Sequence, residues 1–234
     1  MTELDGLAAA LGVERGELIS LVGGGGKTTT LFALGEQLSG TTVLTTTTKM
    51  GADQSSGYGV LIDPTDAELA AELTRNDRTL AWQAADGRRA IGVSAQRCDE
   101  WFAIADNVVT EADGSRKRPF KAPAAHEPVI PSQTTLLVAC IGSSAFDRPI
   151  AESCHRPDLV AALAGCEVGD ALTPARAAAL LLSRDGSQKH LPDQSRFAVA
   201  LHRVTPENDS LVDELADRLG SAVTLVAVQE NTGP

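Results

Sequence analysis

Two clusters of threonines, each beside a lysine, stand out near the start of the chain. The first, GGGGKTTT, covers residues 23–30, and the second, TTTTK, covers residues 45–49. Consecutive glycines let several backbone N–H groups turn toward one anion, while lysine and threonine side chains can bind phosphate oxygens and a divalent cation. Because each cluster follows a short apolar run, we expect both at strand ends, facing one phosphate-bearing ligand.

The first cluster has the setting of a phosphate-binding loop. It follows the apolar run Leu18–Val22 and opens a predicted helix over Thr28–Leu38, whose N-terminus favours negative charge. In such a loop the lysine reaches the β- and γ-phosphates and the first hydroxyl binds Mg²⁺. A turn that merely joins a strand to a helix is the structural alternative. The residues predicted to bind nucleotide here are Gly23, Gly24, Gly25, Gly26, Lys27, Thr28 and Thr29.

This loop departs from the strict pattern GxxxxGK[ST], which requires a glycine where the chain has Leu21. Its shorter form, from Gly23 to Thr29, is similar to the loop of Mur-type ligases, whereas the additional early lysine of MinD-like ATPases is absent. A Mur-like ligase or a small-molecule kinase is therefore an alternative function. The sequence shows no acceptor-binding signature that would support it.

The second cluster ends the next apolar run, Thr42–Thr46. In a doubly wound sheet, ligands bind beyond the carboxyl ends of the strands, so Thr48 and Lys49 are expected beside the phosphates if the two strands are near neighbours. The alternative is structural, since threonine is a good strand former and Lys49 could lie at an edge. We assign Thr45 and Thr46 to the strand itself.

An acidic strand end follows in the stretch NVVTEADGS, which resembles a Walker-B element. A carboxylate at such a position can hold a Mg²⁺-bound water or orient an attacking one. We therefore predict catalytic roles for Lys27, Glu111 and Asp113, and a metal site formed by Thr28 and Asp113.

Residues 114–133 are rich in proline and basic side chains and have little periodicity. A loop of that length in a compact domain is usually functional or disordered. Its positive charge, which includes Arg116 and Lys121, could be ordinary solvated surface charge. We favour a switch segment that faces an anion.

Apolar runs alternate with helical patterns along the chain, which predicts a mostly parallel, doubly wound α/β sheet flanked by helices, similar to P-loop NTPases. The predicted strands are Leu18–Val22, Thr42–Thr46, Thr79–Gln83, Asn107–Glu111, Thr135–Ile141, Phe197–His202 and Val223–Val228. The predicted helices are Thr28–Leu38, Asp66–Leu73, Ala95–Ile104, Arg156–Ala164, Pro174–Ser183 and Glu207–Leu219. We expect one domain over residues 1–234, with a small hairpin insertion around 79–94.

The net charge of −11 argues against a nucleic-acid-binding surface, which needs clustered Lys and Arg. The acidic N-terminus does not fit a signal peptide, and no apolar run approaches the length of a membrane span. The four cysteines are widely spaced, which favours reduced thiols over zinc or disulfides. We therefore expect a cytoplasmic protein; the sequence leaves its oligomeric state open.

Four motifs together carry a resemblance: VGGGGKTT, TTTTK, EADGSRKRPFKAPAAHEPVIP and HRPDL. They are similar to those of the YqeC-type family of accessory proteins for selenium-dependent molybdenum hydroxylases, and the likeness runs from about Leu18 to Val228. This resemblance implies a P-loop-like nucleotide-binding fold and a role in maturing molybdenum hydroxylases. Its implied partner is such a hydroxylase or its molybdenum cofactor.

By position, the resemblance marks Gly23, Gly26, Lys27 and Thr28 for nucleotide and Glu111, Asp113 and Gly114 for the metal side. For the substrate or switch side we name Arg116, Lys121, His126, Glu127, His155 and Arg156. The family pattern would end a later strand with an NKxD-like element that reads guanine. The chain instead has LHRVT at 201–205, without Asn or Asp, so ATP is favoured over GTP.

Two functions from different classes remain. One is a Mg²⁺-dependent nucleoside triphosphate-binding protein that acts as a slow NTPase during hydroxylase maturation. The other is a nucleotide-gated scaffold or chaperone with negligible hydrolysis, for which the segments 48–58 and 114–133 would change conformation.

Overall fold

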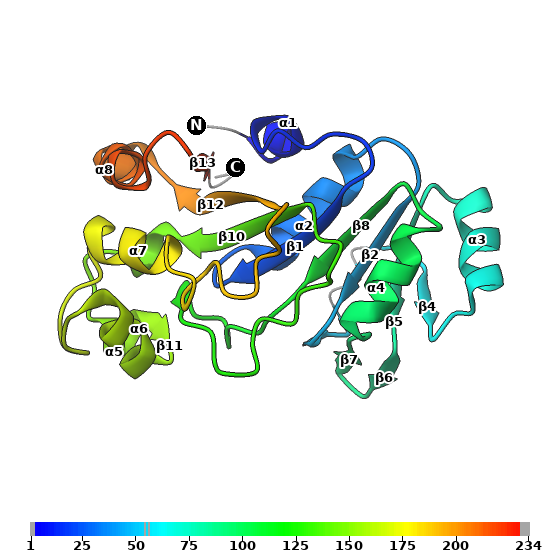
Figure 1. The fold of residues 1–234 in the computed structure, drawn as a ribbon, viewed down its shortest axis with the longest axis horizontal. Coiled ribbons are helices and arrows are strands. Elements are labelled where there is room, and N and C mark those ends of the chain that lie inside the picture. The colour runs from blue at the N-terminus through cyan, green and yellow to red at the C-terminus, as the bar shows by residue number, and fades with distance from the viewer. Residues whose placement is uncertain (1–2, 54, 56, 230–234) are drawn as a thin grey trace.

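A computed structural model describes residues 3–53, 55 and 57–229 (Figure 1). Its strands are β1 Leu18–Gly23, β2 Thr42–Thr46, β3 Lys49–Gly51, β4 Val60–Ile62, β5 Arg78–Trp82, β6 Ala84–Asp86, β7 Arg89–Ile91, β8 Asn107–Glu111, β9 Phe120–Lys121, β10 Leu136–Gly142, β11 Cys154–His155, β12 Arg196–Val204 and β13 Thr224–Gln229. Its α-helices are α1 Leu7–Ala10, α2 Lys27–Gln37, α3 Asp66–Arg75, α4 Ala95–Phe102, α5 Ile150–Ser153, α6 Pro157–Ala164, α7 Pro174–Leu181 and α8 Asp209–Leu219.

The core is an eight-stranded sheet with the order β13-β12-β10-β1-β8-β2-β5-β4. Every strand pairing in it is parallel. Parallel strands covered on both faces need apolar side chains on both faces, and β1, β2, β8 and β10 are buried along their whole length. The predicted α/β fold class, with a parallel sheet flanked by helices as in P-loop NTPases, is confirmed.

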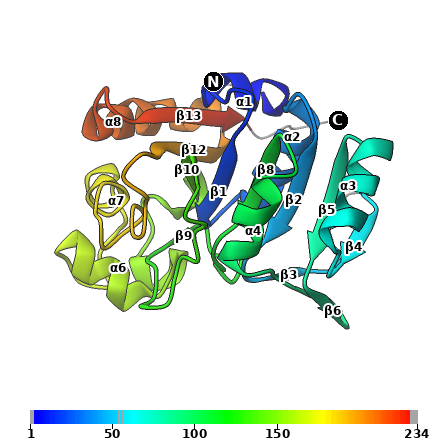
Figure 2. The same ribbon diagram turned by 45° about the vertical axis from the view of Figure 1, so that its right-hand side comes forward.

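Successive side chains of β1 point to opposite faces of the main sheet, and their contacts show which helices cover each face. Ile19 and Leu21 point to one face, where they pack with α1 and α2. Leu18 and Val22 point to the other face, but into two separate clusters. One of these clusters is covered by α3 and α4, and the other by α5 to α8, so the helices of this face occupy opposite ends of the sheet (Figures 1 and 2). The segment that follows β8 runs between the two groups.

All seven predicted strands occur in the main sheet, each with ends within two residues of the prediction. The apolar stretch 59–62 adds the eighth strand, β4, at the sheet edge. Strand β7 forms an antiparallel three-stranded sheet with β3 and β6. Its β6–β7 hairpin lies within the range 79–94; the single-domain expectation stays a prediction.

Three helix starts differ from the prediction: α2 begins at Lys27 rather than Thr28, and the other two differ for local reasons. The last helix begins at Asp209 rather than Glu207 because Pro206–Asn208 form a 3₁₀ turn. Helix α6 begins at Pro157 rather than Arg156, since Arg156 has a left-handed backbone with φ of 59° and stands just before the first turn. The helix-starting proline at 174 was predicted correctly, with the Thr173 hydroxyl accepting from the N–H of Arg176.

The basic segment 114–133 has one short strand, β9, which pairs in parallel with β11. The segment also contacts the loop after α7, since Lys189 Nζ donates to the carbonyls of Ala124 and Ala125 at 2.7 and 3.1 Å.

Among residues 3–53, 55 and 57–229, no helix is long and apolar enough to cross a membrane.

Candidate functional site

The site lies at the carboxyl ends of the central strands, where β1 turns into α2 through residues 23–26. Gly26 has φ of 109°, and a side chain there would collide with the ring of His202. A side chain on Gly24 would collide with the backbone of Arg118 and Phe120. Glycine is thus required at both positions, once for backbone conformation and once because the 114–133 segment passes directly over the loop.

Lys27 is the first residue of α2, and its side chain folds back into the loop. The ammonium donates to the carbonyl of Gly23 at 2.6 Å and lies 3.2 Å from Asp113 Oδ1. Burial alone would lower the pKa of Lys27, but the carboxylates of Asp113 and Glu111 outweigh it and raise that pKa. Lys27 is therefore a buried, fully charged cation at the N-terminus of a helix.

Thr28 and Glu111 connect the start of α2 to the end of β8. The Thr28 hydroxyl donates to Glu111 Oε1 at 2.6 Å. Burial raises the pKa of the Glu111 carboxyl, against the opposing effects of Lys27 and of the Thr28 hydroxyl. Thr29, the third residue predicted in this helical turn, is exposed and has no described contact with the acidic pair.

Asp113 is the centre of the site because it contacts both the loop and the basic segment. Its Oδ2 accepts from the N–H of Gly23 at 3.0 Å and lies 3.0 Å from Lys121 Nζ. Its Oδ1 faces Lys27 but accepts no hydrogen bond among the described residues. One buried carboxylate is thus shared by two lysines from different parts of the chain.

The chain of charges continues outward from Lys121. Its ammonium also donates to Glu127 Oε2 at 2.6 Å, and Arg156 donates to both oxygens of Glu127 at 2.7 and 3.1 Å. Burial would raise the pKa of Glu127, but the hydrogen bonds from Arg156 and Lys121 hold it at about 2. Five charged side chains, from Lys27 through Asp113, Lys121 and Glu127 to Arg156, therefore form one continuous network, which is buried except at the half-buried Arg156.

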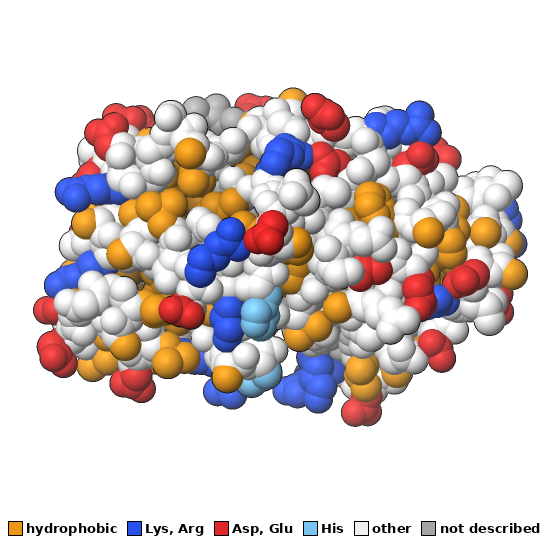
Figure 3. Space-filling view, in the orientation of Figure 1, with side chains coloured by type: hydrophobic (Ala, Val, Ile, Leu, Met, Phe, Trp, Pro, Cys, Tyr) orange, Lys and Arg blue, Asp and Glu red, His pale blue; other side chains and the backbone are white. Residues whose placement is uncertain are grey.

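The other substrate or switch candidates lie at the margin of this network. His155 is half-buried next to Lys121 in the β9–β11 ladder, and burial and the charges of Arg156, Lys121 and Arg116 lower its pKa. Arg116 and His126 are exposed. On the face drawn in Figure 3, Lys, Arg and His side chains gather toward the lower middle, and acidic side chains are scattered over the rest.

The second threonine cluster contacts the site through Thr47 and not through Lys49. Thr47 N–H donates to the Glu111 carbonyl at 2.9 Å, and the Thr47 hydroxyl donates to the Val129 carbonyl at 2.8 Å. Thr48 bonds back to Thr46. Lys49 is exposed in β3, and within the described ranges it has no hydrogen bond or ion pair to the phosphate loop.

Sequence reasoning missed one residue of the site, His202, which enters from β12. Its Nε2 lies 2.9 Å from the hydroxyl of Thr30, and its ring packs against Gly26. Burial lowers the pKa of His202 to about 4, so the ring is neutral at pH 7. The sequence signal for such a residue is a polar side chain at the carboxyl end of a buried apolar run.

The metal ligands that this site offers are oxygen atoms. Over the described part of the chain there is no cluster of three His, Cys, Asp or Glu side chains suited to hold a metal. The hydroxyl and carboxylates of Thr28, Glu111 and Asp113 are hard oxygen donors of the kind that Mg²⁺ prefers, and Mg²⁺ usually completes its shell with phosphate oxygens and water. The buried Asp113 Oδ1, which accepts no hydrogen bond in the described chain, is compatible with such a role.

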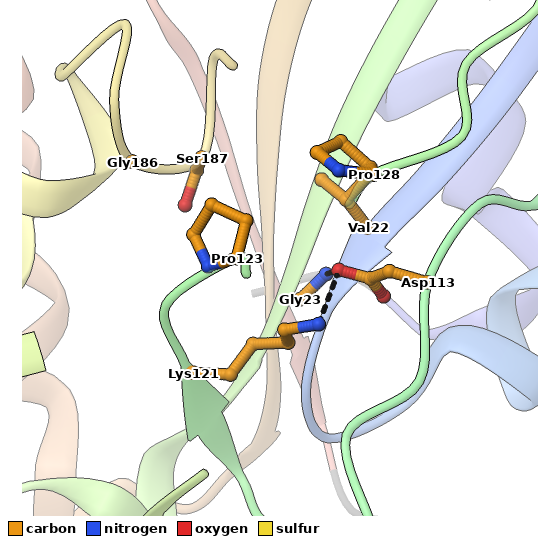
Figure 4. A pocket seen from close by; sticks show the side chains of 8 residues that line it. All are labelled: Val22, Gly23, Asp113, Lys121, Pro123, Pro128, Gly186 and Ser187. Carbon is orange, nitrogen blue, oxygen red and sulfur yellow. Dashed lines mark hydrogen bonds and ion pairs between the residues drawn. The ribbon is translucent and has the colours of Figure 1, made fainter. Parts of the chain in front are cut away.

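A small pocket adjoins the network on its outer side (Figure 4). It is lined by Val22, Gly23, Asp113, Lys121, Pro123, Pro128, Gly186 and Ser187. Its volume is about 10 Å³, which is roughly the space of one water. In Figure 4, Lys121 extends from β9 to Asp113, and Gly23 lies beside the same carboxylate oxygen.

A known protein family resembles this chain over most of its length. The family model described as "YqeC protein" matches residues 19–158, a range that contains the whole charge network. Over 235 aligned positions the chain is 32% identical to the "Uncharacterized protein YqeC" of Escherichia coli (strain K12), with 93% of this chain and 90% of that protein covered. No solved structure matches the chain. The protein belongs to the YqeC family.

Proposed function

We propose that the protein binds a Mg²⁺–nucleoside triphosphate, ATP in preference to GTP, and hydrolyses it slowly. The observation that carries the proposal is the position of Lys27 and Thr28. They open α2 directly after a glycine loop, and the carboxylates of Glu111 and Asp113 face them from the neighbouring strand end. Helix N–H groups, a buried ammonium and paired hard oxygens together match the needs of a metal-bound polyphosphate.

Mg²⁺ would be held by the Thr28 hydroxyl and the carboxylate of Asp113 or Glu111. A divalent ion there would neutralise phosphate charge and orient the phosphates for in-line attack. The same carboxylates would repel a phosphate that arrived without a cation, because like charges at short range in a buried site are strongly unfavourable. We therefore expect nucleotide binding to depend on Mg²⁺.

We expect slow hydrolysis because the arginine of the site, Arg156, is already paired with the carboxylate of Glu127. An arginine finger accounts for a factor of about 10³ to 10⁵ in the rates of related phosphoryl transfers. Arg156 is held in a two-pronged pair with Glu127, at 2.7 and 3.1 Å. We expect the isolated protein to turn over slowly and to accelerate when a partner supplies a further cation.

The preference for ATP rests on the end of β12. Residues 201–205 contain neither Asn nor Asp, the residues that read guanine in an NKxD element. His202, neutral and buried against Gly26, occupies this end of the strand.

The pathway part of the proposal rests on family membership. We propose an accessory role in the maturation of molybdenum hydroxylases, selenium-dependent ones included, with the hydroxylase or its molybdenum cofactor as partner. Replacing the native gene by a Lys27→Met version should lower the activity of such a hydroxylase in cell extracts. Full hydroxylase activity with that variant would remove this part of the proposal.

Calorimetric titration tests the binding function. ATP, GTP and CTP are titrated with and without Mg²⁺ into the wild type and into Lys27→Met, and phosphate release is measured in parallel. Tight, Mg²⁺-dependent binding of ATP that is lost in Lys27→Met would support the proposal. No binding of any of the three nucleotides by the wild type would end it.

A nucleotide-gated scaffold with negligible hydrolysis is the second candidate, favoured by one observation. The network links the phosphate loop to segment 114–133 through Asp113 and Lys121, so a ligand at the loop can alter that segment. Nucleotide-dependent protection of residues 114–133 from proteolysis, without phosphate release, would select this function. Equal protection with and without nucleotide would exclude it.

A further inference from the structure

We propose that Lys121 is a second cation of the phosphate site and that it binds the γ-phosphate of the nucleoside triphosphate. The inference rests on the proposed nucleotide-binding function and adds a residue to it. Lys121 lies almost a hundred residues from Lys27 in the sequence, in a segment outside the phosphate loop.

The first step is the position of the Lys121 ammonium. It lies 3.0 Å from Asp113 Oδ2, the oxygen that accepts from the N–H of Gly23, the first residue of the phosphate loop. Its other partners are Glu127 Oε2 at 2.6 Å and the Gly114 carbonyl at 2.7 Å. The side chain is 1% exposed, so this cation is already desolvated at the edge of the loop.

The second step is that Asp113 cannot keep both lysines when a polyphosphate binds. Lys27 is 3.2 Å from one oxygen and Lys121 is 3.0 Å from the other. If Lys27 and the carboxylate turn to the phosphates and to Mg²⁺, the Asp113 contact of Lys121 weakens. A triphosphate adds negative charge in a low-dielectric site, and Lys121 is a buried cation next to it.

The third step is that the backbone holds Lys121 close to the loop. The carbonyl of Arg118 and the N–H of Phe120 lie so near Gly24 that no side chain fits between them. The Pro119 carbonyl accepts from the N–H of Gly142, at the end of β10. These contacts place the segment that carries Lys121 directly over the glycine loop.

The structural alternative is a lysine that only balances buried carboxylates. Such a lysine would affect ATP and ADP equally, because its removal would disturb the fold and not a particular phosphate. A lysine that binds the γ-phosphate would affect ATP alone. The ratio of ATP affinity to ADP affinity therefore separates the two roles.

The experiment titrates Mg²⁺–ATP and Mg²⁺–ADP into the wild type and into Lys121→Met. We expect the preference for ATP over ADP to fall about tenfold or more, the usual effect of losing a charged hydrogen bond, with ADP affinity nearly unchanged. Lys121→Arg, which keeps the charge, should retain part of the preference. Lys189→Met is the matched control, since Lys189 holds the same segment through the carbonyls of Ala124 and Ala125.

Removing one partner of a buried ion pair can unfold a protein, so a charge-balanced variant accompanies the first. Lys121→Met combined with Glu127→Gln removes one cation and one anion together, and Glu127→Gln alone is its control. Thermal unfolding of each variant shows whether it is folded. The ATP preference should fall further in the double variant than in Glu127→Gln alone.

A wild-type ATP preference in Lys121→Met or in the double variant would overturn the inference. Equal losses of ATP and ADP would overturn it as well, because they indicate a structural lysine. If the wild type binds neither nucleotide, the proposed function fails, and the inference that rests on it fails too. Binding by the wild type with an unchanged ratio in the variants would remove the inference alone.

Discussion

Both clusters place threonines beside a lysine, yet the fold gives the two lysines different environments. In the first, Lys27 is buried, bonded to Gly23 and paired with Asp113. In the second, Lys49 is exposed and sits opposite Ile91 in an antiparallel ladder. The difference arises from what surrounds each cluster. Glycines turn the first into a helix N-terminus, whereas the second leaves its strand by a short turn and enters another strand.

This comparison shows that residue type alone does not decide whether a lysine is buried beside a loop or exposed in a strand. A lysine at the start of a helix can fold back over a loop whose N–H groups point the same way. A lysine in a strand extends away from the backbone on one side of the sheet. The threonines of the second cluster still contribute, since Thr47 ties the turn to the Glu111 carbonyl.

The largest expected effect contrasts the two lysines. Lys27→Met should weaken Mg²⁺–ATP binding about 100-fold, because charged hydrogen bonds contribute up to about 3 kcal/mol. Lys49→Met should change it less than about twofold, since an exposed lysine contributes little. Calorimetric titration of both variants measures the contrast. A comparable loss in Lys49→Met would show that the second cluster also binds phosphate.

Thr28 and Thr48 allow a second comparison of the two clusters, with a smaller expected effect. Thr28→Val should weaken Mg²⁺–ATP binding about tenfold, because it removes one hydroxyl that donates to Glu111 and would bind the metal. Thr48→Val should leave affinity near the wild-type value, since Thr48 bonds within its own turn. Titration with Mg²⁺ at a fixed ATP concentration measures the Mg²⁺ affinity of both variants. A lower Mg²⁺ affinity in Thr48→Val than in the wild type would contradict this prediction.

Acid titration tests the network that distinguishes the first cluster. The folded pKa of Glu127, about 2, lies below its ordinary value of 4.5. Its contribution to stability is therefore complete above pH 4.5 and disappears as the pH falls toward 2. Between these values the wild type should lose stability more steeply than Glu127→Gln, as measured by urea unfolding. Lys49→Met should keep the wild-type slope, and equal slopes for Glu127→Gln and the wild type would refute the assignment.

The smallest expected effect concerns Thr45, a threonine of the second cluster whose hydroxyl bonds to the neighbouring strand of the main sheet. The Thr45 hydroxyl is buried and donates to the Ala81 carbonyl at 2.7 Å. Thr45→Val should cost about 1 kcal/mol of unfolding free energy, the usual value of one such hydrogen bond, without a change in ATP affinity. Chemical denaturation and titration on the same variant check both parts. Weakened nucleotide binding at unchanged stability would reverse the assignment.

Much of the fold was predictable because its signals are local. Buried parallel strands read as short apolar runs, and the seven strongest of these became seven strands of the main sheet. The glycine run and the following Lys27 and Thr28 indicated their own loop and helix. The short elements were missed, such as α1 and α5, since four-residue helices carry too little periodicity to be recognised.

The site was predictable in its parts but not in its connections. Glu111 and Asp113 were found from their place at a strand end, and Arg116, Lys121, Glu127 and Arg156 from their charge and motif. No local pattern specifies that Lys121 and Lys27 share Asp113, because the two lysines are 94 positions apart in the sequence (121 − 27). His202 came from still farther away in the sequence.

The sequence by itself determined the order of elements, the phosphate-loop geometry and the presence of acidic groups at the end of β8. These depend on glycine conformation, apolar runs and residue chemistry, which act over a few neighbours. Only the tertiary structure decided which of the two threonine clusters buries its lysine and which charges pair in the network. Pairing depends on which strand ends become neighbours in the sheet, and burial then makes each charge require a partner.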